Sequence, residues 1–292
     1  MSDLSLPRRR LYALGARLVL ALTATATACV AANAADAVFV EDARVARAFE
    51  QAELHGCFVL FNAQTGVYLG HNAERAATRF LPASTFKIPS SVIGLATGAI
   101  SSVDEVLPWG GGKAFLPAWE KDMGLREAIV VSNVPIYQEL ARRVGLERMQ
   151  AMVRLLDYGN RETGEVVDQF WLRGPLQISA IEQTRFLTRL ARRELPVTRS
   201  AQDAVAEITR QAEGSDAQGR DWVLHAKTGM SLPDDGQGIG WWVGWIERDG
   251  QVFAFALNID VHDIAQAPQR TELGKRILQT LDLLPTVRTP SP

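Results

Sequence analysis

The 292-residue sequence is poor in the residues that staple small domains or hold metals, with only two cysteines and four histidines. Two cysteines exclude a disulfide scaffold, and the histidines lack the spacing of metal ligands. An excess of charge is also missing, because 31 Lys and Arg stand against 33 Asp and Glu. This balance gives no electrostatic reason to expect nucleic acid or anionic lipid as a partner. A hydrophobic content of 47% predicts instead a soluble globular protein with a sizeable core.

The first 34 residues differ from the rest of the chain. Arginines at 8, 9, 10 and 17 are followed by an apolar, alanine-rich run over residues 18–30, and Ala32-Asn33-Ala34 offers a small-x-small cleavage site. The pattern predicts a secretory signal peptide over residues 1–34, a mature domain over residues 35–292 and a periplasmic location. A membrane anchor is the alternative, although three threonines dilute the apolar run. Export by a twin-arginine route and lipidation of Cys29 stay open.

Cys57 is the cysteine that remains after removal of residues 1–34, which also leaves a net charge of about −5. It lies in the apolar run Cys57-Phe58-Val59-Leu60-Phe61. We therefore expect a buried, inert thiol rather than a catalytic nucleophile.

Strand-like runs lie near both ends of the mature chain, and helical patterns lie between them. Predicted strands cover residues 57–62, 67–70, 222–227, 240–246 and 252–259. Predicted helices cover residues 84–97, 136–144, 146–156, 180–194, 201–211 and 269–283. We expect a mixed α/β (α+β) fold in which strands from both ends form one antiparallel sheet flanked by helices. An inserted all-helical lobe then leaves a cleft for a site.

Ser84-Thr85-Phe86-Lys87 has the spacing of a nucleophile beside its base. At positions i and i+3 of a first helical turn, the hydroxyl of Ser84 and the amine of Lys87 fall on one face. No acidic residue lies within four positions of Lys87, and Phe86 and Ile88 beside it are apolar. Burial there would lower the pKa of the amine and let it abstract a proton. Alone, the motif also fits a helix start with a solvated lysine.

Two three-residue elements follow in the chain. Ser132-Asn133-Val134 precedes a helix that Pro135 opens, and Lys227-Thr228-Gly229 ends a predicted strand. At that strand end a lysine and a hydroxyl can point into the cleft, and Gly229 lets a substrate approach the backbone. The order of the three motifs is similar to that of the active-site serine penicillin-recognising enzymes.

The match becomes more specific with two further motifs, Tyr158-Gly159-Asn160 and Trp171-Leu172-Arg173-Gly174-Pro175-Leu176. On all five motifs, over essentially residues 50–280, the chain resembles the class D, oxacillinase-type, serine β-lactamases. The resemblance implies a serine β-lactamase and penicillin-binding-protein-like fold. It also implies hydrolysis of β-lactam antibiotics, including penicillins of the oxacillin type, and hence antibiotic resistance.

By the same resemblance, Ser84 forms the acyl-enzyme, and Lys87 is carboxylated by CO2 or bicarbonate to a carbamate that serves as general base. Trp171 would donate its indole N–H to that group, since a buried charge is costly without a partner. No bound cofactor and no metal are implied. The backbone N–H groups of Ser84 and Met230 would form the oxyanion hole.

The resemblance implies roles for the remaining site residues. Ser132 and Lys227 would relay a proton to the leaving nitrogen. Thr228 and Arg270 would hold the substrate carboxylate, with Gly229 and Met230 on the same strand end. The apolar side chains of Val134 and Leu172 would gate water to the carbamate.

Three of these assignments leave alternatives open. Arg270 could instead be a solvated charge at the start of the last helix. Tyr158 could be a packed aromatic of the helical lobe rather than a direct participant. His225 alternates with Lys227 on its strand and could line the cleft, but we expect a structural role for it.

Two other functions share the motifs. A β-lactam sensor would keep its acyl-enzyme, and a peptidoglycan peptidase would release β-lactam slowly. Sensors of this kind carry transmembrane and protease segments, which the sequence lacks. Small-molecule β-lactams are the expected partners, without nucleic acid or stable membrane association. The choice among penicillins, cephalosporins and carbapenems and the oligomeric state stay open.

Overall fold

The structure is a computed structural model that describes residues 38–233 and 237–285. The predicted signal peptide over residues 1–34 lies outside the described residues, as does most of the C-terminal Pro/Thr/Ser tail. The strands are β1 (Phe39–Glu41), β2 (Gly56–Asn62), β3 (Val67–His71), β4 (Arg79–Phe80), β5 (Ile178–Ser179), β6 (Arg210–Ser215), β7 (Asp221–Ser231), β8 (Gly238–Arg248) and β9 (Gln251–Val261). The helices are α1 (Ala43–Ala52), α2 (Ala73–Ala77), α3 (Lys87–Ala96), α4 (Leu125–Val130), α5 (Val134–Val144), α6 (Leu146–Leu155), α7 (Phe170–Arg173), α8 (Ala180–Ala191), α9 (Arg199–Thr209) and α10 (Gln269–Thr280). Three short 3-10 turns are η1 (Ala83–Phe86), η2 (Pro117–Trp119) and η3 (Ile264–Gln266).

Strands from both ends of the chain form one seven-stranded sheet in the order β1-β3-β2-β9-β8-β7-β6. The N-terminal hairpin joins the C-terminal strands where β2 pairs antiparallel with β9, and only β1 pairs parallel to its neighbour. Between β8 and β9, Asp249 and Gly250 adopt positive φ, which suits a tight hairpin turn. The predicted antiparallel sheet is confirmed.

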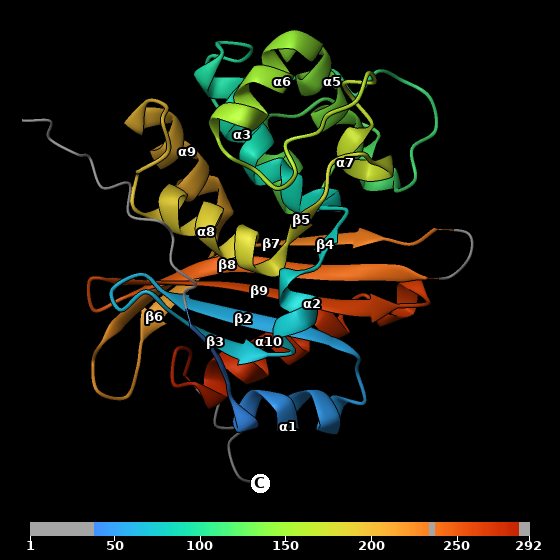
Figure 1. The fold of residues 1–292 in the computed structure, drawn as a ribbon. Coiled ribbons are helices and arrows are strands. Elements are labelled where there is room, and N and C mark those ends of the chain that lie inside the picture. Colours follow the sequence, from blue (N-terminus) through green and yellow to red (C-terminus); the bar gives the residue numbers. More distant parts are fainter. Residues whose placement is uncertain (1–37, 234–236, 286–292) are drawn as a thin grey trace, which may run out of the picture. The chain divides into compact units, whose positions relative to one another are not determined.

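Alternation along the strands divides the sheet into two apolar faces. On β8, Trp241, Val243 and Trp245 belong to one buried cluster, whereas Trp242 and Ile246 belong to another. Successive side chains of a strand point to opposite faces, so a strand that is apolar throughout must be covered on both sides. In Figure 1, α8 covers one face and α1 with α10 covers the other.

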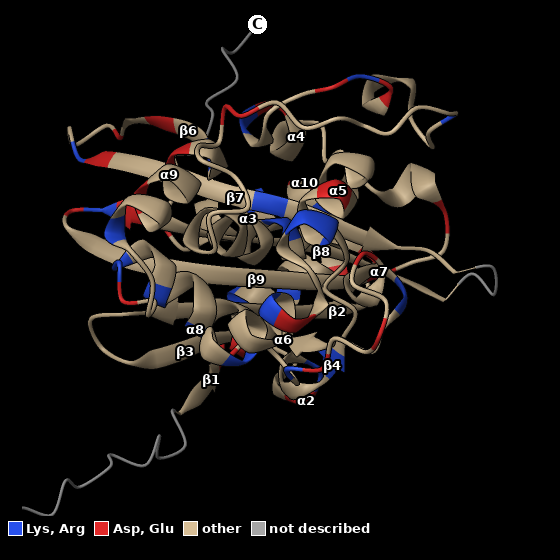
Figure 2. Ribbon diagram, turned by 90° about the horizontal axis from the view of Figure 1, so that it is seen from above, with Lys and Arg blue, Asp and Glu red and all other residues tan. Residues whose placement is uncertain are grey.

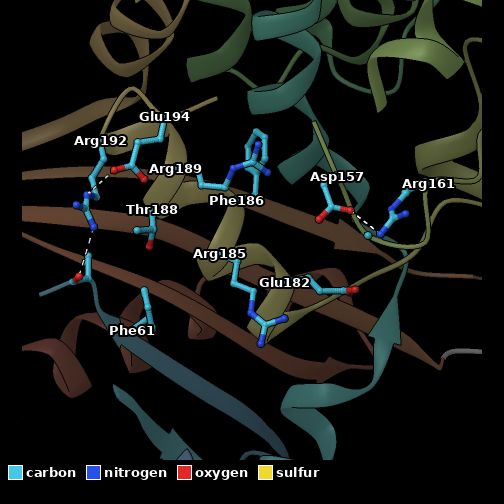
Figure 3. Close-up of a pocket in the computed structure, with 12 residues that line it drawn as sticks. Phe61, Asp157, Arg161, Glu182, Arg185, Phe186, Thr188, Arg189, Arg192 and Glu194 are labelled. Atoms are coloured by element: carbon cyan, nitrogen blue, oxygen red, sulfur yellow. Dashed lines mark hydrogen bonds and ion pairs between the residues drawn. The ribbon is translucent and has the colours of Figure 1, made fainter. Parts of the chain in front are cut away.

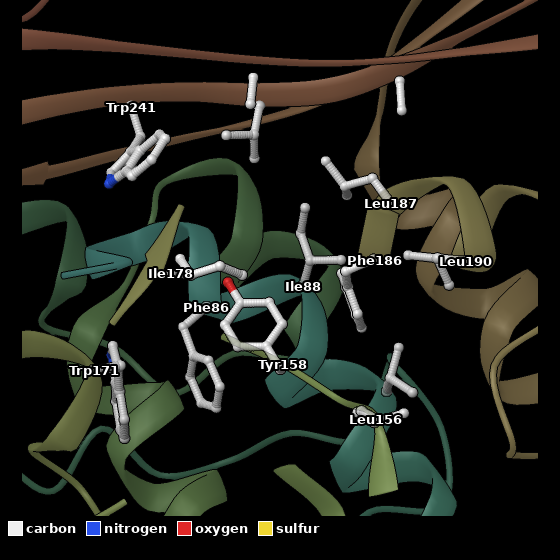
Figure 4. Close-up of a cluster of buried hydrophobic side chains, with 14 of the residues drawn as sticks. Phe86, Ile88, Leu156, Tyr158, Trp171, Ile178, Phe186, Leu187, Leu190 and Trp241 are labelled. Atoms are coloured by element: carbon white, nitrogen blue, oxygen red, sulfur yellow. The ribbon is translucent and has the colours of Figure 1, made fainter. Parts of the chain in front are cut away.

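The helical lobe is inserted between β3 and β6, as predicted, and it packs on the α8 side of the sheet (Figure 1). Its junction with the sheet is rich in aromatic rings (Figure 4). The ring of Phe86, just before α3, stacks on Trp171 at 5.5 Å and meets the rings of Tyr158 and Phe170 edge-on. Such rings bury large apolar areas, so this cluster fixes the residues next to the start of α3.

The structure differs from the sequence prediction at several element boundaries. The helix predicted over residues 201–211 ends at Thr209, and Arg210 begins β6, an edge strand whose six residues are all exposed. Without a buried face, β6 has no apolar alternation that could identify it. The helix predicted from Ser84 begins instead as the 3-10 turn η1 and continues as α3.

Cys57 confirms its predicted burial. Its side chain is fully buried on β2, and it is the free cysteine of the described chain. Burial raises the pKa of its thiol to about 12, which keeps it protonated and inert at neutral pH.

Candidate active site

Ser84 and Lys87 lie where η1 passes into α3. The backbone of Ala83 has φ +47°, a left-handed conformation that turns the chain immediately before Ser84. The indole N–H of Trp241 on β8 donates to the carbonyl of Leu81 at 2.9 Å and ties this segment to the sheet. Lys87 Nζ donates to Ser84 Oγ at 2.9 Å. The predicted nucleophile and base are therefore in direct contact.

Lys87 is 1% exposed, which contradicts a solvated lysine. Burial lowers its pKa well below the ordinary lysine value, and the positive charge of Lys227 lowers it further. The ring of Tyr137 on α5 lies 5.3 Å from Nζ and is itself held by a 2.9 Å hydrogen bond with Ser91. The environment of Lys87 thus favours the uncharged form of an amine that lies beside a hydroxyl.

A second serine-lysine pair bridges the helical lobe and the sheet. Leu224 and Ala226 of β7 point into the cluster under α1 and α10, so Lys227 points to the opposite face, toward the lobe. There its Nζ donates to Ser132 Oγ at 3.0 Å and to the carbonyl of Thr228 at 2.9 Å. Burial, with the charge of Arg270 as the second cause, lowers the pKa of Lys227 to about 7.

Asn133 is a positioning residue, a role that the sequence analysis did not assign to it. Its side chain is fully buried, accepts from the backbone N–H of Ile136 at 3.1 Å to cap α5, and donates to the carbonyl of Trp119 at 3.2 Å. These bonds fix the residue that follows Ser132, whose φ is +57°. Asn followed two residues later by Pro135 is a helix-start signal that could have revealed this role.

Trp171 lies on the short helix α7 with its ring buried. Its Nε1 has no hydrogen-bond partner anywhere in residues 38–233 and 237–285. A buried donor without an acceptor is costly, so this N–H is suited to an acceptor that the protein atoms themselves do not supply.

The predicted substrate residues are only partly brought together. A cavity of about 860 Å³ lies between the end of β7, the end of α7 and the start of η1; Leu172 and Met230 line it with Ala83. Val134, the first residue of α5, and Thr228 are half-buried but do not line this cavity.

Gly229 acts differently from the sequence prediction. The space in which a side chain would lie is not open to a substrate: a Cβ atom there would meet the Pro82 carbonyl oxygen and Thr85 Cγ2 at 3.0 Å each. The missing side chain instead allows β7 to pack closely against η1, which brings Ser84 to the strand end.

Arg270, on the first turn of α10, is half-buried rather than a solvated charge. Its Nη1 donates to the carbonyl of Ala267, while its buried Nε has no partner among the described residues. Burial lowers its pKa, and its charge in turn lowers the pKa of Lys227.

Tyr158 and His225 do not enter the cleft. The Tyr158 hydroxyl donates to Gln183 Oε1 at 3.4 Å, and Gln183 Nε2 donates to Thr85 Oγ1 at 2.9 Å, so both support the residue next to Ser84. Gln183, which the sequence argument missed, sits on the predicted helix 180–194 without a motif to mark it. His225 stacks on Trp245 with ring centres 4.3 Å apart, as expected for a structural residue.

Charges of both signs are interspersed over helices and loops (Figure 2). Among the described residues, no cluster of three or more His, Cys, Asp or Glu could hold a metal ion. Within the same ranges, no helix combines the length and apolar character that a membrane span requires.

The sheet, the inserted lobe and the two serine-lysine pairs at their junction define an active-site serine enzyme of the penicillin-recognising class. The family described as penicillin binding protein transpeptidase domain matches residues 56–279.

Individual relatives narrow this class. β-Lactamase OXA-5 of Pseudomonas aeruginosa is 40% identical over 79% of this chain and 85% of its own length, and β-lactamase OXA-48 of Klebsiella pneumoniae is 38% identical over 81% and 87%. The crystal structure of FUS-1 (OXA-85), a class D β-lactamase from Fusobacterium nucleatum subsp. polymorphum, is 40% identical with a TM-score of 0.79, covering 84% of this chain and 99% of that one. The chain therefore belongs to the class D serine β-lactamases.

Proposed function

We propose that this protein hydrolyses β-lactam antibiotics, including penicillins of the oxacillin type, through an acyl-enzyme on Ser84, and so confers resistance. The observation that carries the proposal is the 2.9 Å contact between Ser84 Oγ and the buried amine of Lys87. A neutral lysine beside a serine hydroxyl is the arrangement that activates the serine as a nucleophile. The relatives named as β-lactamases support the substrate class.

N-carboxylation of Lys87 fits the surroundings of this residue. Only an uncharged amine reacts with CO2, and burial lowers the pKa of Lys87, which favours its uncharged form. The partnerless N–H of Trp171, whose ring stacks on Phe86 beside Lys87, is suited to hold a buried anionic group. Carried by Lys87, the carbamate would supply the general base for acylation and deacylation. No metal or bound cofactor is part of the proposal.

The remaining steps use the protein's own polar groups. Ser84 Oγ attacks the lactam carbonyl, and the backbone N–H groups of Ser84 and Met230 stabilise the oxyanion. Lys227 and Ser132, which are hydrogen-bonded at 3.0 Å, deliver a proton to the leaving nitrogen. A pKa of about 7 suits Lys227 to this exchange at neutral pH, because a proton donor works best when its pKa is close to the ambient pH.

Binding of the substrate completes the proposal. Thr228 and Arg270 hold the substrate carboxylate, and the half-buried guanidinium gains the charge-assisted contact that its partnerless Nε lacks. Val134 and Leu172 present apolar side chains that control the access of water. We place the enzyme in the periplasm, after removal of the predicted signal peptide.

The decisive measurement is turnover of a penicillin by the purified mature protein in the presence of bicarbonate. We expect many product molecules per enzyme, with a covalent adduct on Ser84 that mass spectrometry detects at early times. Acylation that stops after one equivalent would instead support the sensor or the slow peptidase, and would contradict the hydrolase.

Bicarbonate dependence tests the carbamate separately. Degassing or acid pH should slow deacylation, and added bicarbonate should restore it. Trp171→Phe keeps an aromatic ring against Phe86 but removes the N–H, so we expect it to need about tenfold more bicarbonate for half-maximal turnover. Trp222→Phe is the matched control, because the Trp222 N–H is also buried without a partner but lies on the apolar side of the sheet under α1 and α10. Equal bicarbonate requirements in wild type and Trp171→Phe would contradict the role of Trp171.

A further inference from the structure

A second cavity, of about 460 Å³, lies along α8, and it shares no residue with the catalytic site (Figure 3). Its size is within the range of small-ligand sites in proteins. Its walls come from the end of β2, the turn after α6, and α8 with the residues that follow. The lining residues are Phe61, Ala63, Asp157, Gly159, Arg161, Glu182, Arg185, Phe186, Thr188, Arg189, Arg192 and Glu194.

Each carboxylate in the lining is already neutralised by an arginine. Asp157 pairs with Arg161 at 2.6 Å, and Glu194 pairs with Arg192 at 3.0 Å. Glu182 pairs at 2.5 Å with an arginine outside the cavity lining, at position 79. The lining thus keeps no free negative charge.

Two arginines of the lining, Arg185 and Arg189, take no part in these ion pairs. Neither forms an ion pair with a carboxylate in residues 38–233 or 237–285; Arg185 donates instead to the hydroxyl of Tyr68 at 2.8 Å and Arg189 to the carbonyl of Leu156 at 2.9 Å. Four residues apart on α8, they lie on one helix face, where like charges repel and destabilise the helix. Both line the cavity, which therefore has two positive charges that its carboxylates do not neutralise, and a bound anion would offset them.

A polar group on the same stretch of α8 also lacks a partner. Thr188 lies on the same face of α8, is 6% exposed, and its Oγ1 has no hydrogen-bond partner within the described chain. Figure 3 shows Thr188 between Arg185 and Arg192, on the side of α8 that faces Phe61. A buried hydroxyl without a partner is costly unless a bound group accepts from it.

We propose that this cavity is a binding site for a small dianion, either a phosphate or a dicarboxylate. The two excess arginines match two negative charges, and a guanidinium binds phosphate or carboxylate oxygens through paired N–H groups. The hydroxyl of Thr188 supplies a third donor. The site does not depend on the β-lactamase activity proposed above.

Titration calorimetry of the mature protein at low ionic strength tests the site. The probes are inorganic phosphate and succinate, which distinguish the two dianion chemistries, with acetate as a monoanion. We expect one saturable site for at least one dianion, bound at least tenfold more tightly than acetate. The double variant Arg185→Gln/Arg189→Gln should weaken that binding at least tenfold, and Thr188→Val should weaken it about threefold.

Two controls decide whether any binding seen is specific. Arg199→Gln removes a surface charge on α9 outside the cavity, and it should change the affinity less than twofold. Arg270→Gln reports anion binding in the catalytic site instead. The proposal is overturned if the wild type and the α8 double variant bind alike, if Arg199→Gln weakens binding as much, or if only Arg270→Gln abolishes it. Should the double variant fail to fold, the single substitutions and Thr188→Val make the same comparison.

Discussion

The two serine-lysine pairs at the junction of lobe and sheet have nearly the same contact distance but very different separations in the sequence. Ser84 and Lys87 are three residues apart and in contact at 2.9 Å, whereas Ser132 and Lys227 are 95 residues apart and in contact at 3.0 Å. The first pair needs little more than one helical turn. The second exists only when the lobe is packed on β7, so it depends on the whole fold.

The pairs also differ in the surroundings of the amine. Lys87 Nζ donates to Ser84 Oγ, whereas Lys227 Nζ donates to the carbonyl of Thr228 as well as to Ser132 Oγ. Both amines are buried, and both pKa values are lowered, that of Lys227 to about 7. The amine of Lys87, which has fewer hydrogen bonds, suits activation of a serine hydroxyl. The amine of Lys227, which has more, suits delivery of a proton.

Removal of the first pair should have the largest effect. We expect Ser84→Ala to lower kcat for penicillin by about 10⁴-fold or more, because no covalent intermediate can form. Lys87→Ala should abolish acylation or trap the acyl-enzyme, which intact-protein mass spectrometry distinguishes. Full turnover by Lys87→Ala would contradict a special role of the first pair in activating the serine. Ser101→Ala, on an exposed turn of the lobe, is the matched control and should retain wild-type turnover.

Substitutions in the second pair should cost less. Ser132→Ala and Lys227→Ala should each lower kcat by about 10² to 10³-fold, the range of a single proton-transfer group. The double variant should be little worse than either single variant, because the two groups act through one hydrogen bond. If the double variant instead lowers kcat by the product of the two single-variant factors, measured in the same assay, Ser132 and Lys227 act independently.

This contrast explains what the sequence could predict. The sequence shows the Ser84-Lys87 spacing, the apolar neighbours of Lys87 and the strand-helix-strand order. The sheet, the lobe and the burial of Lys87 in the structure agree with these features. The partner of Lys227 followed only from family resemblance, since nothing in the spacing brings position 227 to position 132. Pairing of that kind is set by the tertiary packing.

Other features left no sequence signal. The left-handed backbone at Ala83 and Ser132 is unusual for residues with a side chain, and the surrounding packing imposes it. Gln183 on α8 donates to Thr85, the residue beside Ser84, and no motif marks its position in the helix. Gly229 was expected to face the substrate but faces η1, because the approach of β7 to η1 cannot be read from one strand alone.

The smallest expected effect is on stability, and it compares the two lysines directly. A lysine whose folded pKa is lowered binds fewer protons when folded than when unfolded, so the free energy of unfolding rises with pH between the folded and unfolded pKa values. For Lys227, with a folded pKa of about 7, we expect a slope of about 1.4 kcal/mol per pH unit near pH 8. Lys87 should add a slope of the same sign, since its pKa is lowered in the same direction.

Urea unfolding at pH 7.0 to 8.5 in CO2-free buffer measures these slopes. Higher pH is avoided because the unfolded Cys57 thiol then ionises while the folded one, with its raised pKa, does not, and this opposes the rise in stability. Lys227→Met should lose about 1.4 kcal/mol per pH unit of slope near pH 8, and Lys87→Met should also lower the slope, whereas the exposed Lys121→Met should keep the wild-type slope. A Lys87→Met variant that retains the full slope would mean that this amine is charged when folded, and the local pair would then lack the neutral base on which its chemistry depends.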